Sequence, residues 1–517
     1  MRSLAIALLM LLLLPPSQVS AIPNDASAVC ADESATPDAQ IEACTQQGIA
    51  DKLNPHLAAL DYYHRATAYA RKGELETTLA DLSSAIAVEP GNVESWTARC
   101  YVWNLKKDID KTKATCSQAI ALDQSNAAAY RTRAYALMAE GSWDAAIGDF
   151  TEAIRLKPTN SASYVGRGNC LNAKGQFAQA SINFDEAIKR NPHNADAFAG
   201  RGESRGRSND IQGAIADFNE ALRLEPAKTS TRLDRALIFY DAGDTKRALE
   251  DIADVLQMKP NNSRALGMQA HIYEELGEWN NALVGYSSLV RVDPTSVIGW
   301  KGRCNVLLSL GEPERSVSDC DQALRVAPDQ TLIYEDWAFA KFTIGRLDES
   351  LAGFDKALKS NPDDSWGLFQ RGVVSYYLDR MDYSIADFEH ALKVDSKSSY
   401  SALWRYLART RDSANLSALE DLSRASTKLD KDLWPEAIVE FYLGRIDENA
   451  LIKAAETNDK KKNAGNVCEM NFYVGQFLLR SGKAKFGRKR FQTAIDQCPR
   501  RYVEYVASLR ELENIKN

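Results

Sequence analysis

The residues best suited to covalent chemistry in this chain of 517 residues are its nine cysteines. Two thiols whose Cα atoms lie within about 7 Å of each other can join as a disulfide in an oxidising compartment. Two pairs, Cys100 with Cys116 and Cys304 with Cys320, have the same separation along the chain. Equal separations at distant places are typical of one structural element used twice. The spacing therefore predicts disulfides and a repeated element that positions them.

A repeat of 34 residues supplies that element, and residues 127–160 show it most clearly. Apolar and small residues recur at helical spacing on both sides of Gly141, which interrupts the helical pattern. They are Tyr130, Ala134, Leu137, Ala146, Phe150 and Ala153. Pro158 ends the second run. The pattern predicts two antiparallel helices that approach closely at Ala134 and Ala146.

Counting in steps of 34 from residue 127 tests this register along the whole chain. Position 32 is proline in eight of ten repeats, namely Pro90, Pro158, Pro192, Pro226, Pro260, Pro294, Pro328 and Pro362. Position 8 is small in all ten, as Ala66, Cys100, Ala134, Gly168, Gly202, Ala236, Ala270, Cys304, Ala338 and Gly372. We therefore expect ten repeats over residues 59–398, each of which buries its core against its neighbours.

This pattern resembles the tetratricopeptide repeat (TPR), which has the same period and the same small and proline positions. The resemblance implies an all-α fold. The fold that it implies is an α-solenoid, in which helix pairs stack into a right-handed superhelix.

The repeat register also pairs the cysteines. Facing residues of an antiparallel helix pair have position numbers with a constant sum, and both equally spaced pairs occupy positions 8 and 24. Cys468 and Cys498 obey the same rule in a repeat that returns near the C-terminus. Cys30 and Cys44 form a fourth candidate pair, in an N-terminal cap over residues 22–58.

Cys170 is left over, and its expected role is that of a buried small side chain, with a reactive thiol as the alternative. The cysteine pairs lack the spacing of a metal site and the five histidines are scattered, so we expect no metal and no cofactor. The sequence has no HExxH motif and no P-loop. The chain is therefore predicted not to be an enzyme, with no catalytic residues.

Residues 1–21 are typical of a secretory signal peptide. A basic start at Arg2 precedes an unbroken apolar run over residues 4–14, and small residues lead to Ala21. The run is shorter than the roughly 20 residues that a membrane-spanning helix needs. We therefore expect cleavage after Ala21, a periplasmic or secreted protein, and no stable membrane insertion.

Charge excludes one class of partner and predicts internal bridges. A formal net charge of -7 leaves no basic surplus to neutralise phosphates, so nucleic acid is not an expected partner. Position 7 is arginine in eight repeats, as Arg65, Arg99, Arg133, Arg167, Arg201, Arg235, Arg303 and Arg371. Position 23 is aspartate in six, as Asp81, Asp149, Asp217, Asp251, Asp319 and Asp387. Because these positions nearly face each other, they predict Arg–Asp bridges, with polyanion binding as the alternative.

The TPR resemblance places positions 2, 5, 6, 9, 12 and 13 of each first helix on a concave surface. In repeats nine and ten, eight of these residues are apolar and form what we call the apolar shelf: Leu332, Phe339, Phe342, Trp366, Phe369, Val373, Tyr376 and Tyr377. Acidic residues precede or accompany them, namely Asp234, Asp241, Glu274, Glu275, Glu335 and Asp336. Together they predict a groove for an extended or helical peptide with apolar anchors and basic residues. In the alternative, the C-terminal part of the chain folds back over the shelf and buries it.

Some TPR domains hold a C-terminal carboxylate with one lysine and two asparagines. Lys301 and Asn305 match the lysine and the first asparagine. Asp336 takes the place of the second asparagine, and its charge would repel a carboxylate. We therefore do not expect a carboxylate ligand there.

The period is lost after residue 398. We expect an irregular helical module over residues 399–467, with a polar loop at 460–466, and then a terminal TPR-like repeat and capping helix over residues 468–517. The segments LWPEAIVEFYLG, CEMNFYVGQFLLRSGKAK and CPRRYVEYVASLREL are similar to the C-terminal part of the NlpI-like periplasmic TPR adaptors.

That resemblance implies a non-enzymatic scaffold or adaptor that binds proteins or extended peptides through its groove. It implies an envelope protease or a peptidoglycan hydrolase among the partners. This chain departs from the family because Ile22, not a lipid-attachment cysteine, follows the cleavage pattern, and because it has more repeats. The alternative function is that of a component of an envelope export or polysaccharide-secretion assembly.

Overall fold

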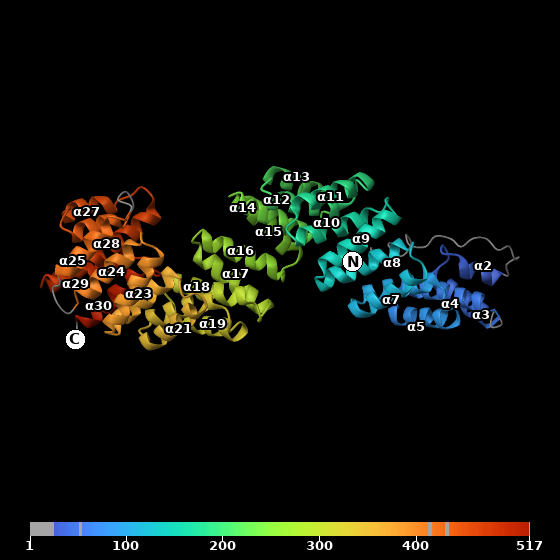
Figure 1. Ribbon diagram of the computed structural model, residues 1–517, viewed down its shortest axis with the longest axis horizontal. Coiled ribbons are helices and arrows are strands. Elements are labelled where there is room, and N and C mark those ends of the chain that lie inside the picture. The colour runs from blue at the N-terminus through green and yellow to red at the C-terminus, as the bar shows by residue number, and fades with distance from the viewer. Residues whose placement is uncertain (1–24, 51–53, 412–415, 430–433, 516–517) are drawn as a thin grey trace. The chain divides into compact units, whose positions relative to one another are not determined.

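The computed structural model describes residues 25–50, 54–411, 416–429 and 434–515 (Figure 1). These residues form α-helices joined by short turns, and the described segments contain no β-strand. The predicted all-α solenoid of helix pairs is confirmed. The predicted signal peptide lies outside the described residues. No helix within those four segments is long and apolar enough to cross a membrane.

The chain divides into two compact units, residues 1–251 and 252–517, and each is described by itself. The first contains α2 (Asp25–Ala31), α3 (Pro37–Ala50), α4 (Pro55–Lys72), α5 (Leu75–Val88), α6 (Val93–Leu105), α7 (Ile109–Leu122), α8 (Ala127–Glu140), α9 (Trp143–Leu156), α10 (Ser161–Ala173), α11 (Phe177–Arg190), α12 (Ala195–Arg207), α13 (Ile211–Leu224) and α14 (Thr229–Asp241). The boundary between the units falls within α15 (Thr245–Met258).

The second unit holds the last repeats and the helices that follow them. It contains α16 (Ser263–Glu275), α17 (Trp279–Val292), α18 (Val297–Leu310), α19 (Pro313–Val326), α20 (Thr331–Thr343), α21 (Leu347–Ser360), α22 (Ser365–Tyr377), α23 (Met381–Val394), α24 (Ser399–Arg409), α25 (Leu416–Ser426), α26 (Glu436–Tyr442), α27 (Glu448–Ala455), α28 (Lys460–Arg480), α29 (Ala484–Gln497) and α30 (Val503–Asn514).

The pair α8 and α9 shows how the sequence sets each helix pair. The side-chain oxygen of Asn126 accepts a hydrogen bond from the amide of Ala129 at 3.0 Å and so caps the start of α8. Gly141, at φ 82°, adopts the left-handed conformation that ends the helix. α9 then ends at Leu156, shortly before Pro158. The helix ends predicted from Gly141 and Pro158 are therefore the helix ends in the structure.

Two helices begin earlier than the repeat register predicts. α4 begins at Pro55 because the side-chain oxygen of Asn54 accepts hydrogen bonds from the backbone amides of His56 and Leu57. α28 begins at Lys460, so the predicted polar loop at 460–466 is wrong. The carboxylate of Asp459 accepts from the amide of Lys462 at 3.2 Å and starts the helix there.

Aromatic rings from second helices fill the space that small residues leave on first helices. Phe184 is fully buried. A Cβ atom added at Gly168 would lie 2.8 Å from its ring, and one added at Gly200 would lie 2.4 Å away. Such distances are shorter than carbon atoms tolerate, so only the smallest residues fit against this ring.

Four disulfides join the eight cysteines that the sequence analysis pairs: Cys30–Cys44, Cys100–Cys116, Cys304–Cys320 and Cys468–Cys498. Their Cα atoms lie 4.7 to 5.5 Å apart, which is the ordinary range. Cys170 remains unpaired in the described part of the chain and is fully buried beside Phe150. Burial raises the pKa of its thiol to about 11.

Thiol titration of the unfolded, unreduced protein should therefore detect one thiol per chain, that of Cys170. In the native protein the same reagent should react far more slowly, because this thiol is buried and protonated at neutral pH. The Cys170→Ala variant should give no signal in either state. Detection of any further pair of thiols would contradict the four disulfides.

Six Arg–Asp bridges link the first helix to the second within their repeats, which confirms the structural role predicted for these arginines. In each bridge Nε and Nη2 of arginine donate to the two carboxylate oxygens over 2.6 to 2.9 Å. The pairs are Arg65–Asp81, Arg133–Asp149, Arg201–Asp217, Arg235–Asp251, Arg303–Asp319 and Arg371–Asp387. In several of them Nη1 also donates to the preceding repeat, as from Arg133 to Ser117 at 2.9 Å. These bridges therefore tie neighbouring repeats together as well.

Removal of one bridge should cost about 3 kcal/mol of unfolding free energy. Asp217 is buried and accepts hydrogen bonds from both Arg201 and Arg205, so Asp217→Ala leaves two guanidinium groups without their buried partner. Asp144 is exposed and pairs with Lys174, so Asp144→Ala should change stability by only about 0.5 kcal/mol. Urea unfolding followed by circular dichroism measures both, and equal losses would contradict the assignment.

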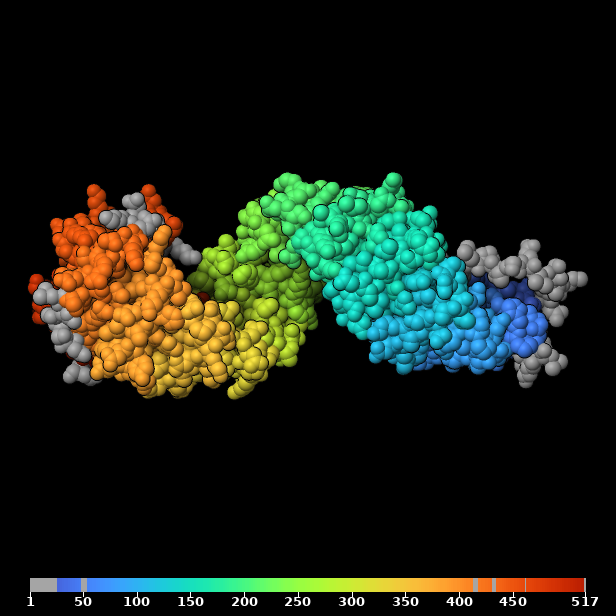
Figure 2. All heavy atoms as spheres, in the orientation of Figure 1, coloured from blue at the N-terminus to red at the C-terminus, as the bar shows by residue number. Residues whose placement is uncertain are grey.

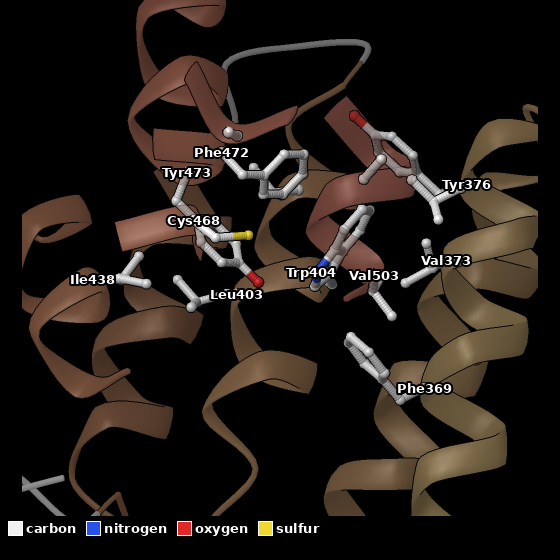
Figure 3. Close-up of a cluster of buried hydrophobic side chains, with 14 of the residues drawn as sticks. Phe369, Val373, Tyr376, Leu403, Trp404, Ile438, Cys468, Phe472, Tyr473 and Val503 are labelled. Carbon is white, nitrogen blue, oxygen red and sulfur yellow. The ribbon is translucent and has the colours of Figure 1, made fainter. Parts of the chain in front are cut away.

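The last helices of the second unit enclose an aromatic core. Trp404 of α24 is fully buried, with its ring stacked 5.5 Å from that of Phe472 on α28. Figure 3 shows Phe369 and Tyr376 of α22 facing Trp404 from the other side. In Figure 2 the orange and red atoms of this region form one continuous body. The last repeats and the helices after them thus share one core, which includes buried residues from Leu308 to Ala507.

Candidate partner-binding surface

The structure buries most of the apolar shelf. Its buried members are Phe339, Phe342, Phe369, Val373 and Tyr376, and Tyr377 is largely covered too. They therefore line no open groove, and the prediction that they contact a partner is wrong for this structure. The arrangement is the alternative one, in which the C-terminal part of the chain covers them. Leu332 and Trp366 stay exposed.

Helix α30 supplies much of this cover. The hydroxyl of Tyr377 donates to the backbone oxygen of Ala507 at 3.2 Å and to the carboxylate of Glu511 at 3.0 Å. Arg510 donates to the backbone oxygen of Thr343 at 2.9 Å. Apolar side chains of α30 enter the same core as the shelf. The chain's own last helix therefore occupies the surface that the sequence offered to a partner.

Asp336 is held by internal donors. Nη2 of Arg501 donates to its carboxylate at 3.2 Å, and Nζ of Lys301 lies 3.9 Å away. With its amide nitrogen turned toward Asp336, Asn305 donates to both carboxylate oxygens over 2.9 and 3.1 Å. Burial raises the pKa of Asp336, and the two cations oppose that rise. Lys301 and Asn305 thus bind a carboxylate of the chain itself, which leaves no clamp for a ligand.

Glu335 lies beside this carboxylate. Burial, together with the nearby carboxylates of Asp364 and Asp336, raises the pKa of Glu335 to about 7. The part of this rise that the two neighbouring carboxylates cause means that negative charge is crowded at this place. A cation brought by a partner would relieve the crowding.

The other predicted acidic residues fall in both units. Asp234 and Asp241 belong to the first unit, where Asp241 is exposed. Glu274 and Glu275 belong to the second, and Glu274 accepts a hydrogen bond from the hydroxyl of Tyr286 at 2.6 Å. No cluster of ligating side chains in the described residues is placed to hold a metal ion.

Exposed apolar side chains form a row along the second unit, which we call the rim row: Ile298, Leu332 and Trp366. Each is the second residue of its helix, in α18, α20 and α22, and their exposed fractions are 68%, 59% and 51%. These three helices contact one another in turn. The second residues of α6, α8, α10, α12 and α14 in the first unit are small or polar: Glu94, Ala128, Ala162, Asp196 and Ser230. An exposed apolar row of this kind marks an interaction surface.

The similarity to known proteins lies in the repeats. The family model described as tetratricopeptide repeat matches residues 114–161, 165–229 and 233–296. These three ranges of the chain are therefore similar to tetratricopeptide repeats. Among solved structures, it is similar to a TPR protein from Parabacteroides merdae, at 18% identity and a TM-score of 0.38, over 47% of this chain and 96% of that one.

Two further solved structures are similar to parts of the chain. One is PilW, described as a widely conserved type IV pilus biogenesis factor, at 18% identity and a TM-score of 0.38, over 40% of this chain and 96% of that one. The other is YrrB, described as a TPR protein with an unusual peptide-binding site, at 17% identity and a TM-score of 0.31, over 36% of this chain and 95% of that one.

The TPR pattern predicted two members of the rim row and missed the third. Leu332 and Trp366 were expected at position 2 of their repeats, and Ile298 occupies the same position one repeat earlier. A count of large apolar residues at position 2 along the sequence would have found it, together with Leu60 of the first repeat. The pattern could not show which groove residues stay open, because that depends on α30, which lies far along the sequence.

Proposed function

We propose that the protein is a non-enzymatic scaffold or adaptor outside the cytoplasm, which binds protein partners through the rim row. TPR solenoids present extended surfaces to other proteins. The observation that carries the proposal is the exposure of Ile298, Leu332 and Trp366 in three successive repeats. The apolar shelf is not the site in this proposal, because the chain covers it.

The proposed location is the periplasm or the extracellular space. The signal-like residues 1–21 support it, and so do the four disulfides, since disulfides persist in oxidising compartments. The similarity of the C-terminal segments to NlpI-like adaptors makes an envelope protease or a peptidoglycan hydrolase the first partner to test.

Affinity capture with the mature protein, against a variant with Ile298, Leu332 and Trp366 all changed to alanine, tests the proposal. A matched control changes three equally exposed apolar residues on second helices, Ile182, Val284 and Tyr383, whose exposed fractions are 63%, 67% and 72%. Specific proteins should be retained by the parent and the control and lost by the rim-row variant. Equal retention by all three baits would contradict a rim-row site.

The second candidate function is that of a component of an envelope export or polysaccharide-secretion assembly. It is favoured by Trp366, whose half-exposed ring offers a flat face to a sugar. Binding through a sugar face should be insensitive to salt, whereas binding of a basic peptide near Glu335 should weaken as salt rises. Capture repeated at high salt separates the two.

A further inference from the structure

A cavity lies where the rim row meets the C-terminal helices. Its volume is about 550 Å³, which is within the range of ligand sites. Trp366 and Phe369 of α22, Tyr400 of α24, and Trp434 with Pro435 line it. Tyr400 is also the second residue of its helix, so the cavity continues the rim row by one step.

Internal contacts hold the aromatic walls of this cavity in place. The indole nitrogen of Trp434 and the hydroxyl of Tyr400 donate to the same carboxylate oxygen of Glu469, at 2.7 and 2.8 Å. The ring of Trp366 stacks on that of Phe369 at 5.2 Å and 23°. The polar ends of two walls are thus occupied inside the protein. The ring faces of Trp434 and Tyr400 that line the cavity are available to a ligand. Because these side chains are already held in place, binding costs less conformational entropy.

The spacing of the row limits the shape of the ligand. Helices in contact lie about 8 to 10 Å apart, and a chain in the extended polyproline II conformation has three residues per turn and advances about 3.1 Å per residue. Apolar side chains at every third residue of such an extended segment lie on one side, about 9 Å apart, and therefore match Ile298, Leu332, Trp366 and the cavity in turn.

Charge limits the composition of the ligand. Glu335 and Asp364 lie beside the row, and Asp395 lines the cavity together with one cation, Lys397. The carboxylates crowded around Glu335 favour a ligand that carries positive charge.

We propose that the cavity at Trp366 and Trp434 anchors an extended, basic segment of a partner protein, whose apolar side chains recur at every third residue and whose last apolar side chain enters the cavity. This rests on the proposed function, and it names the chemistry of the partner.

The test uses the mature protein and labelled synthetic peptides, with binding measured by fluorescence anisotropy. In the first peptide leucine recurs at every third position, lysine lies between the leucines, and phenylalanine takes the last apolar position. In the second the same residues are rearranged so that the apolar ones alternate. The first should bind at least about tenfold more tightly, because only its apolar side chains fall on one side of a polyproline II segment at the spacing of the row. Equal affinities would overturn the proposal.

Two variants locate the binding. Trp366→Ala should weaken binding of the first peptide by about tenfold, in line with the loss of a buried aromatic anchor, whereas Tyr383→Ala should leave it unchanged. Ser399→Trp, at the wall of the cavity, should block the last anchor without removing any core side chain. Unchanged binding in both cavity variants, with circular dichroism equal to the parent, would overturn the cavity as the site.

The result also separates this proposal from the function on which it rests. If neither peptide binds but capture still depends on the rim row, the adaptor function stands and the proposed ligand is wrong. If neither peptide binds and the rim-row variant captures the same proteins as the parent, both the proposed ligand and the adaptor function through the rim row are wrong. Quenching of tryptophan fluorescence by a neutral N-acetylglucosamine oligomer, without peptide binding, would overturn the proposal in favour of a sugar ligand.

Discussion

Trp404→Ala is expected to lower the unfolding free energy of the second unit by about 4 kcal/mol. The ring of Trp404 is fully buried and lies within 6.4 Å, between ring centroids, of five other aromatic rings. They belong to Phe369, Tyr376, Tyr377, Phe388 and Phe472. Truncation leaves a cavity that three packed helices cannot close, so both the transfer term and the cavity term oppose folding.

Trp404→Phe is the matched control. Nε1 of Trp404 has no hydrogen-bond partner among the described residues, so replacing the indole removes no internal hydrogen bond. The phenyl ring keeps most of the buried volume, and the expected loss is about 1.5 kcal/mol or less. Urea unfolding gives both values. Hydrogen exchange should accelerate in α22, α24 and α28 of the alanine variant and stay unchanged in α8 and α9. Equal losses of unfolding free energy in the two variants would mean that the packing of an aromatic ring at this position does not stabilise the core.

The repeat itself could be predicted from the sequence because its determinants are local. Asn126, Gly141 and Pro158 act within a few residues of the helix ends that they set, and the pairing of Cys100 with Cys116 follows from the geometry of one helix pair. The Arg–Asp bridges follow from the same geometry. A register of 34 residues therefore carries both the helices and the contacts inside each repeat.

The open surface could not be predicted in the same way, because it depends on contacts between distant segments. Phe339 and Trp366 are both apolar residues at groove positions. The first is buried and the second is half exposed, since the C-terminal helices cover one part of the groove and stop short of the other. No local sequence pattern indicates which groove residues the C-terminal helices contact. The cavity beside Trp366 exists only because Trp434 reaches it from a segment outside the repeats.

Stability of the second unit should fall as the pH rises, by about 6 kcal/mol between pH 5 and pH 8. Two buried carboxyl groups cause this. Burial raises the pKa of Glu469 from its ordinary value of 4.5 to about 7, and burial together with the charge of Glu469 raises that of Glu504 to about 8. Tyr400, Trp434 and Tyr473 donate hydrogen bonds to them without cancelling the effect of burial.

The direction follows from the protons that each state binds. Below the unfolded pKa both states are protonated, and the contribution of these groups to stability is fully present. Above it the unfolded chain loses its protons first, so unfolding becomes easier by about 1.4 kcal/mol per pH unit for each group. The loss ends as the pH passes the folded pKa values. Burial also raises the pKa of Tyr400 and of Tyr473, so those hydroxyls stay neutral throughout this range.

The double variant Glu469→Gln with Glu504→Gln isolates the effect, because glutamine keeps a side-chain oxygen that accepts hydrogen bonds and cannot ionise. Its unfolding free energy, measured in urea at each pH, should decrease far less than that of the parent, and the remaining decrease should come from Glu335 and Asp336, whose pKa values burial also raises. Since the same core covers the apolar shelf, the parent should also bind more of a hydrophobic dye at pH 9 than at pH 6, and the double variant should not. Parallel pH profiles for the two proteins would show that these carboxyl groups do not control the core. A difference confined to the parent would mean that the cover over the shelf loosens as Glu469 and Glu504 lose their protons.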